Sequence, residues 1–292
     1  MSQVARYFCV GVALLSAICI AEGSQDKAEQ EFKEIQRAVD KCEISFPVGI
    51  RRYRRAIRRY PESEFSARAS YAIGELFEKI GEVEEASIAY MGVIENYPDS
   101  ERFSPAIQDL YRIGCYLFDL EETGVLRNTY EQARKILRKI LEVFPSVANA
   151  GEIQYKVAYC SLELGQYDEA ASEFQKVIKD YPEEPFLEKA IYHLGVSFLK
   201  QSLPAERDQT MTDKAISQFT HFLSKYPESQ FAENAQEKIS ILRDRKAKSL
   251  YCICLFYKKG KEERAFLFYC RELVRRFPDT EWAKRARKFL ER

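Results

Sequence analysis

The sequence predicts an all-α protein in which pairs of antiparallel helices repeat along the chain. Apolar residues follow a helical period in several segments, and glycine or other small residues recur where paired helices would approach closely. An aromatic residue followed by proline also recurs, at Tyr60-Pro61, Tyr97-Pro98, Phe144-Pro145, Tyr181-Pro182, Tyr226-Pro227 and Phe277-Pro278. Such repeats are typical of tetratricopeptide proteins. We therefore expect a superhelical solenoid of about five helix pairs followed by a C-terminal helix.

The segment 212–245 shows the repeat most clearly. We expect its first helix to begin near Thr212, whose hydroxyl can cap the free N–H groups of the first turn. Pro227 should end that helix, because proline has no N–H to donate and keeps the preceding residue out of helical geometry. Ser229 can then cap the second helix. The apolar face of the first helix consists of Ala215, Ile216, Phe219, Phe222, Leu223 and Tyr226.

Two further repeats match the tetratricopeptide template when counted back from their prolines. From Pro98, the count places Gly74 in a first helix and Gly81 at the turn between helices. From Pro182, it places Gly165 at the corresponding turn. Glycine suits such a turn because it readily adopts the left-handed conformation that ends many helices. The longer repeats are expected to carry insertions near residues 119–127 and 203–210.

Residues 1–23 are expected to be a secretory signal peptide and not part of the fold. Arg6 supplies positive charge, and the apolar run at residues 8–21 is shorter than the roughly 20 residues that span a bilayer. Small residues before Ser24 favour ordinary cleavage there. Cys19 offers a second route, lipidation as in bacterial lipoproteins, although bulky Ile18 precedes it. Both routes predict export.

Composition and motifs argue against catalysis and against nucleic-acid binding. Lys and Arg total 45 and so do Asp and Glu, so the chain is not a general binder of polyanions. The sequence has no phosphate-binding glycine loop and no hydrolase or metalloprotease motif. Only His193 and His221 are available as histidine ligands, and the sequence has no Cys-x-x-Cys pair, so no metal site or cofactor is expected.

Six cysteines follow the signal segment, and most occupy apolar positions of helical patterns, where cysteine acts as a small hydrophobic residue. An exported protein can form disulfides. Cys254 and Cys270 are expected on facing helices of the last pair. They form the one bridge that the pattern allows, and their redox state is left open.

The segment 49–60 should form a helix with one strongly basic face. Ile50, Tyr53 and Ile57 recur on its buried side. The opposite side carries Arg51, Arg52, Arg55, Arg58 and Arg59. This basic face is either a solvated helix surface or a dock for acidic lipid head groups or an acidic protein surface, since arginine pairs well with both.

First helices of tetratricopeptide pairs line a concave surface, and that surface is the expected binding groove for client segments. Tyrosine suits such a groove because it offers apolar area at low entropic cost together with one hydrogen bond. The template places six residues there: Arg68, Tyr71, Glu75, Tyr111, Tyr155 and Tyr159. Alternatively, several of these rings pack against neighbouring helices.

Motifs in the C-terminal part of the chain carry a closer resemblance. Asp208-Gln209-Thr210, Tyr226-Pro227, Arg243-Asp244-Arg245, Phe256-Tyr257 and Phe277-Pro278 follow one another with the spacing found in the BamD family. That family comprises the lipoprotein subunits of the bacterial outer-membrane β-barrel assembly machine. The N-terminal half is similar in layout, but its motifs are generic to the repeat.

The resemblance implies a non-catalytic scaffold at the periplasmic face of the outer membrane of a diderm bacterium. It divides the chain into repeats at 24–182, which would contact unfolded outer-membrane protein segments, and repeats at 183–292, which would hold the POTRA region of BamA. The inner leaflet of the outer membrane would be reached through a lipid or through the partner.

The resemblance also implies a set of partner-docking residues. Asp208, Gln209 and Thr210 are assigned first to ordering the inserted loop and capping a helix, and second to docking. The set comprises Asp208, Gln209, Thr210, Arg243, Tyr257, Tyr269 and Arg271. Two positions depart from the family: Tyr269 stands where the family has a basic residue, and Leu250 replaces a glutamate. The contact with BamA is therefore expected to use partly different residues.

An alternative function belongs to another class of protein. Soluble periplasmic repeat proteins that coordinate envelope constriction with peptidoglycan synthesis share the aromatic–proline repeats and an ordinary signal peptide. They usually begin with a trimerising coiled coil, whereas the apolar pattern at residues 25–44 covers under three heptads. An adaptor for secretion or pili is a third possibility. Neither explains the motifs at 208–245.

Overall fold

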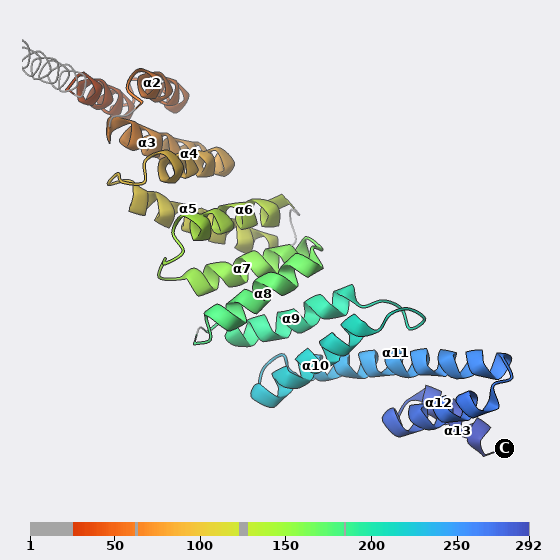
Figure 1. Ribbon diagram of the computed structural model, residues 1–292. Helices are drawn as coiled ribbons and strands as arrows, with labels where there is room; N and C mark the ends of the chain where they lie inside the picture. Colours follow the sequence, from red (N-terminus) through yellow and green to blue (C-terminus); the bar gives the residue numbers. More distant parts are fainter. Residues whose placement is uncertain (1–25, 62–63, 123–127, 184, 292) are drawn as a thin grey trace, which may run out of the picture. The chain divides into compact units, whose positions relative to one another are not determined.

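The computed structural model describes residues 26–61, 64–122, 128–183 and 185–291, and all the regular structure in these ranges is helical. Within each of the two compact units, the helices follow one another in antiparallel pairs that pack against their neighbours in sequence (Figure 1). This is the tetratricopeptide-type, all-α fold that the repeat pattern predicts. No helix among the described residues combines the length and apolar character that crossing a bilayer requires. The predicted signal peptide and Cys19 lie outside these residues.

The chain divides into two compact units, with the boundary between Pro145 and Ser146. The first unit begins with helical residues 26–40. It continues with α2 (Phe46–Arg59), α3 (Glu64–Ile80), α4 (Val83–Asn96), α5 (Phe103–Glu122) and α6 (Asn128–Val143). Its N-terminal core joins the first helix to α2 and α3 through apolar side chains that include Phe32, Tyr53 and Phe65.

The second unit, residues 146–292, contains the remaining helices. They are α7 (Ala150–Glu163), α8 (Tyr167–Asp180), α9 (Leu187–Gln201), α10 (Thr210–Lys225), α11 (Ala232–Lys259), α12 (Glu263–Arg276) and α13 (Glu281–Leu290). Helix α11 is long enough to pack against α10 near its beginning and against α12 and α13 near its end. The compact units divide one repeat earlier than the 182/183 boundary expected between client and partner regions. The roles of those regions remain a prediction.

The aromatic–proline pairs end helices for the physical reason that the sequence suggests. The residue before proline leaves the helical region at α2, α4, α8, α10 and α12, with φ between −131° and −136° and ψ between 54° and 64°. Its own N–H still donates to the carbonyl four residues earlier, as Tyr226 does to Phe222 at 2.8 Å. The helix therefore closes its last turn and then stops at the proline.

Glycine serves two different purposes in the repeats. Gly81 and Gly165 lie in the turns after α3 and α7 with φ of +88° and +79°, the left-handed conformation that glycine adopts without strain. Gly74 instead lies against the ring of Tyr90 on α4. A Cβ at Gly74 would meet Tyr90 Cε1 at 2.5 Å, so the absence of a side chain allows α3 and α4 to pack closely.

The start of α10 differs from expectation. The helix begins at Thr210, so Thr212 lies inside the first turn and is not its N-cap. The Thr212 hydroxyl donates to Gln209 Oε1 at 3.0 Å. Asp208 Oδ1 accepts hydrogen bonds from both the backbone N–H and the hydroxyl of Thr210, at 3.0 and 2.8 Å. The acidic side chain two residues before the helix therefore performs the capping expected of Thr212.

Candidate functional site

Three of the predicted client residues, Arg68, Tyr71 and Glu75, lie along one face of α3, and two of them make polar contacts with neighbouring helices. Arg68 Nη1 donates to Glu29 Oε2 at 2.7 Å, and its guanidinium carbon lies 4.4 Å from the centre of the Phe32 ring. The Tyr71 hydroxyl donates to Asp109 Oδ2 on α5 at 2.6 Å. These two residues therefore connect α3 to the first helix and to α5.

A charged bridge extends this surface across α3 and α5. Arg112 Nη2 donates to Glu78 Oε1 at 2.7 Å and to Asp109 Oδ1 at 2.8 Å. Both carboxylates accept a hydrogen bond from the same guanidinium, and the opposite charges strengthen these bonds. Sequence reasoning missed Glu78, Asp109 and Arg112, although the spacing of Asp109 and Arg112 places them on one face of a first helix.

Glu75 lies on the same face of α3 as Tyr71 and is exposed. The Glu75 side chain makes no hydrogen bond to another described residue. Surrounding protein atoms partly desolvate its carboxyl group and raise its pKa, an effect that the nearby Lys79 and Arg102 oppose. Burial, together with the hydrogen bond to Asp109, raises the pKa of Tyr71. We name the surface formed by Arg68, Tyr71, Glu75, Glu78, Asp109 and Arg112 the polar face.

Tyr111, the fourth client residue in this unit, is half-buried on α5. The remaining two client residues belong to the second unit and are described there separately. Tyr155 and Tyr159 on α7 lie with ring centres 6.2 Å apart. Tyr155 is only 7% exposed and stacks on Phe186 at 5.4 Å, so its ring mainly stabilises helix packing. Tyr159 retains more exposed surface.

His193 on α9 lies at the centre of this aromatic group. Its ring centre is 5.1 Å from that of Tyr159 and 5.8 Å from that of Phe174. His193 Nδ1 lies 2.9 Å from the carbonyl oxygen of Lys189 and 3.3 Å from the Tyr155 hydroxyl. Burial disfavours the imidazolium and lowers the pKa of His193 to about 4. The histidine is therefore a neutral packing residue at neutral pH.

This environment predicts a stability loss in mild acid. The unfolded chain should protonate His193 near pH 6.5, whereas the folded chain does so near pH 4. Because the folded pKa is lowered, the stabilisation is present above pH 6.5 and is lost as pH falls towards 4, by about 3 kcal/mol in total. We expect His193→Phe to flatten the dependence of unfolding free energy on pH between 6.5 and 5, measured by urea titration.

His221 provides the matched control, because it is exposed on α10. The variant His221→Phe should keep the pH dependence of the wild type. An equal slope for the wild type and His193→Phe would show that the aromatic group does not hold His193 neutral.

The predicted docking residues at the start of α10 act within the chain. Gln209 Nε2 donates to the carbonyl oxygens of Pro204 and Arg207, each at 2.9 Å. With the Asp208–Thr210 contacts described above, these bonds hold the inserted loop against the helix. The contacts support the first of the two roles assigned to Asp208, Gln209 and Thr210. Docking by these residues stays a prediction.

The Arg243-Asp244-Arg245 motif also makes contacts inside the second unit. The guanidinium carbon of Arg243 lies 5.7 Å from the centre of the Phe277 ring. Asp244 Oδ2 accepts from Trp282 Nε1 at 3.1 Å. Arg245 Nη1 donates to Ser202 Oγ at 2.5 Å. The motif thus ties α11 to α13 and to the end of α9.

An exposed aromatic surface lies on α11 and α12. Tyr257 and Tyr269 stack across the two helices with ring centres 5.2 Å apart and planes inclined by 7°. Phe256 and Phe268 extend the surface on either side, with 71% and 58% of their area exposed. Electrostatic interaction with Tyr269 raises the pKa of Tyr257. We name Phe256, Tyr257, Phe268 and Tyr269 the aromatic face. Sequence reasoning missed Phe268, although it directly precedes Tyr269.

The interior beneath the aromatic face contains a pair of cysteines. Cys254 and Cys270 are fully buried in the apolar cluster of α11, α12 and α13. Burial raises the pKa of both thiols. The cysteines lie on facing helices, as the sequence indicates, and are free thiols in this structure. Leu250, where the family resemblance implies a glutamate, packs against the same apolar cluster.

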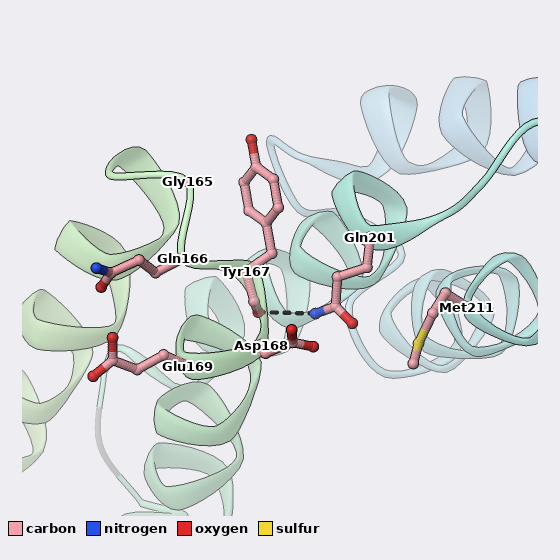
Figure 2. A pocket seen from close by; sticks show the side chains of 7 residues that line it. All are labelled: Gly165, Gln166, Tyr167, Asp168, Glu169, Gln201 and Met211. Carbon is pink, nitrogen blue, oxygen red and sulfur yellow. Dashed lines mark hydrogen bonds between the residues drawn. The ribbon is translucent and has the colours of Figure 1, made fainter.

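The described part of the chain has open hollows on its surface. One of about 630 Å³ is lined by Gly165, Gln166, Tyr167, Asp168, Glu169, Gln201 and Met211 (Figure 2). Gln201 Nε2 donates to the Tyr167 carbonyl oxygen at 2.9 Å, which joins the end of α9 to the beginning of α8. The lining contains no nucleophile–base pair. Within the described ranges, no group of three or more His, Cys, Asp or Glu residues could hold a metal ion.

Comparison with solved structures finds similar chains at low sequence identity. MamA from Desulfovibrio magneticus is 18% identical, with 70% of this chain and 98% of that chain covered and a TM-score of 0.34. YrrB, described as a TPR protein with an unusual peptide-binding site, is 18% identical, with 81% and 97% covered and a TM-score of 0.33. A tetratricopeptide repeat protein from Parabacteroides merdae is 14% identical, with 91% and 100% covered and a TM-score of 0.35.

Comparison with protein-family models identifies the family of the chain. No curated protein matches the sequence. A tetratricopeptide repeat family matches residues 45–101, within the first unit. The YfiO family, described as outer membrane lipoprotein, matches residues 116–291, which is more than half of the chain. The protein therefore belongs to the YfiO, or BamD, family of outer membrane lipoproteins with tetratricopeptide repeats.

Proposed function

We propose that this chain is a scaffold of the outer-membrane β-barrel assembly machine that holds the POTRA region of BamA through α11 and α12. Membership of the YfiO family implies a role in outer membrane assembly, and tetratricopeptide scaffolds are generally non-catalytic. The observation that carries the finer assignment is the aromatic face, in which Phe256 and Phe268 are 71% and 58% exposed. Exposed clustered aromatic rings of this kind are typical anchors of protein interfaces.

A charged residue lies beside the aromatic face, as at the polar rim of a protein interface. Arg271 follows Phe268 by three residues, so both lie on the same side of α12. Arg271 is exposed and makes no ion pair among the described residues. It can supply the positive charge that the family carries at the position of Tyr269. The proposed interface therefore combines an aromatic centre with a neighbouring arginine, a composition common at interface cores and rims.

We further propose that the polar face of the first unit contacts unfolded outer-membrane protein segments. Most of its charges pair with each other, as Arg112 does with Glu78 and Asp109. Glu75 remains available for a hydrogen bond from a client backbone or side chain, and Tyr71 offers ring area beside it. Most charged groups of the polar face are already paired, and only the Glu75 carboxylate has no hydrogen-bond partner among the described residues. Such a surface suits transient contact with many client sequences.

A photo-crosslinking residue at position 75 tests the client assignment. We expect it to trap unfolded barrel segments in the periplasm, because Glu75 is exposed and its replacement breaks no hydrogen bond. The matched control carries the crosslinker at Ile88, which is 49% exposed on α4. Equal yields at positions 75 and 88 would contradict a specific client surface on α3.

Affinity capture from a diderm host tests the whole proposal. The full-length chain with a C-terminal tag would be crosslinked in intact cells and recovered from detergent-solubilised envelopes. We expect BamA among the recovered proteins, and the intact mass of the chain would distinguish lipidation of Cys19 from cleavage before Ser24. Recovery of peptidoglycan-synthesis proteins without BamA would replace the proposal with the envelope-constriction function.

A further inference from the structure

Helix α2 carries a dense row of arginines on its outer side. Ile50, Tyr53 and Ala56 are buried against the first helix and α3. The opposite side of the helix carries Arg51, Arg52, Arg54, Arg55, Arg58 and Arg59, all of which are exposed. The packing of the first unit therefore fixes six guanidinium groups on the surface of one short helix.

The arginines at the edges of this row have partners within the protein. Arg54 Nη2 lies 3.8 Å from Glu85 Oε2 on α4. Arg59 Nη1 lies 2.9 Å from Glu31 Oε2 on the first helix. These contacts neutralise Arg54 and Arg59, and they leave the arginines between the two edges of the row without an acidic partner in the described part of the chain.

The central arginines form a stripe without such partners. Arg51, Arg55 and Arg58 are spaced by four and three residues, so they lie above one another on the helix. None makes an ion pair among the described residues. Arg55 also borders a hollow of about 510 Å³ between the first helix and α2. The lining of that hollow is mainly polar and consists of Lys27, Gln30, Glu31, Glu34, Ile35, Arg52, Arg55 and Arg59. We name Arg51, Arg55 and Arg58 the arginine stripe.

We infer that the arginine stripe binds the anionic head groups of a lipid bilayer. Guanidinium groups donate paired hydrogen bonds to phosphate oxygens, and several basic residues on one surface add their attraction to an anionic membrane. This interaction goes beyond the assembly function and does not require BamA. It would orient the first unit with α2 towards the membrane surface.

Two observations favour lipid over an acidic protein as the occupant. The large apolar side chains that are exposed elsewhere in the described chain are absent from α2. A protein interface usually has an aromatic or apolar centre, whereas adsorption to head groups needs only charge. The stripe therefore has the chemistry of a membrane-adsorbing surface and lacks that of a protein interface.

The second observation is the place of α2 in the chain. The first helix packs directly on α2, with the Phe32 and Tyr53 ring centres 5.5 Å apart. Residue 26, where the described chain begins, follows Cys19 by seven residues, a reach of at most about 25 Å. A lipid on Cys19 would thus keep α2 close to the bilayer.

Vesicle binding by the full-length chain with Cys19→Ala tests the inference, because the substitution removes any acyl contribution. We expect binding to phosphatidylcholine vesicles containing about 30 mol% phosphatidylglycerol, weakening as salt rises from about 0.05 to 0.5 M. Binding to pure phosphatidylcholine should be absent. Failure to bind the anionic vesicles, or equal binding to both compositions, would overturn the inference.

A matched pair of triple variants locates the binding surface. Arg51→Gln, Arg55→Gln and Arg58→Gln together should weaken binding on the order of 100-fold. Arg264→Gln, Lys284→Gln and Lys288→Gln remove the same charge from exposed positions of α12 and α13 and should leave binding within about threefold. If both triple variants lost vesicle binding equally, net charge alone would explain the binding and the inference would be overturned.

Two further measurements separate lipid binding from folding and from assembly. The lysine version of the stripe, with Arg51, Arg55 and Arg58 each replaced by Lys, should retain most of the binding, whereas a loss equal to that of the glutamine version would contradict head-group attraction. Capture of BamA should be unchanged in the glutamine version if the two surfaces act independently. A crosslink from position 55 to an acidic protein, without vesicle binding, would assign the stripe to a protein partner instead.

Discussion

Replacing Phe256 and Phe268 together by serine should weaken capture of the BamA POTRA region on the order of 100-fold. Each ring is an exposed anchor on the aromatic face, and truncating an interface anchor commonly costs about 2 kcal/mol or more. The fold should survive because both side chains already lie mostly in water, at 71% and 58% exposure. Titration of the immobilised full-length chain with purified POTRA region measures the change.

A matched control and a second variant sharpen this prediction. Ile88→Ser with Tyr116→Ser removes two exposed apolar side chains from the first unit, at 49% and 51% exposure, and should leave capture unchanged. Tyr257→Ala with Arg271→Glu should also weaken capture, because it removes one stacked ring and reverses the adjoining charge. Unchanged affinity in both α11–α12 variants would exclude the aromatic face as the docking surface.

Replacing Gly74 by alanine should destabilise the first unit by about 1–3 kcal/mol. The new Cβ would lie 2.5 Å from Tyr90 Cε1, and the Tyr90 ring is only 1% exposed and has little room to move. Either the ring must leave its position or α3 and α4 must separate. Thermal and urea denaturation of the full-length chain, followed by circular dichroism, would measure the loss.

Replacing Gly92 in the neighbouring helix α4 by alanine should change stability in the opposite direction. A Cβ there meets nothing closer than the Asn96 side chain at 3.9 Å. Gly92→Ala should therefore stabilise α4 by about 0.5–1 kcal/mol through helix propensity. If both alanine variants changed stability in the same direction, the close approach of α3 and α4 at Gly74 would be refuted.

The repeat architecture could be predicted because its signals are local. Proline restricts the residue before it, so the aromatic–proline pairs mark helix ends without reference to tertiary structure. Gly81 and Gly165 mark turns for a similarly local reason. The start of α10 could not be placed as well, because the sequence offers both Thr212 and the segment Asp208-Gln209-Thr210 as caps, and the hydrogen bonds come from Asp208. Loop geometry decides between these nearby candidates.

Only part of the candidate sites could be predicted. Helical periodicity is enough to place the arginines of α2 on its outer side, because one buried stripe defines the opposite face. The Tyr71–Asp109 and Arg112–Glu78 contacts could not be foreseen, since they depend on how α3 and α5 are placed relative to each other. The burial of Tyr155 likewise depends on Phe186 and His193, which come from a later repeat.

The departures from the family also acquire physical meaning in the second unit. Leu250 packs in the apolar cluster of α11, α12 and α13, so an apolar side chain suits that position better than a glutamate. Tyr269 stacks on Tyr257, where a basic side chain would not reproduce the ring contact. The surface around Tyr257 and Tyr269 is therefore aromatic, and we expect the partner surface to be correspondingly apolar.

The most direct measurement is site-specific photo-crosslinking from position 268 of the full-length chain in living cells of a diderm host. We predict an adduct with the POTRA region of BamA from position 268 and none from the exposed control position 88. A chain that crosslinks to BamA from position 88 but not from position 268, or that yields no BamA adduct at either, would contradict docking through the aromatic face.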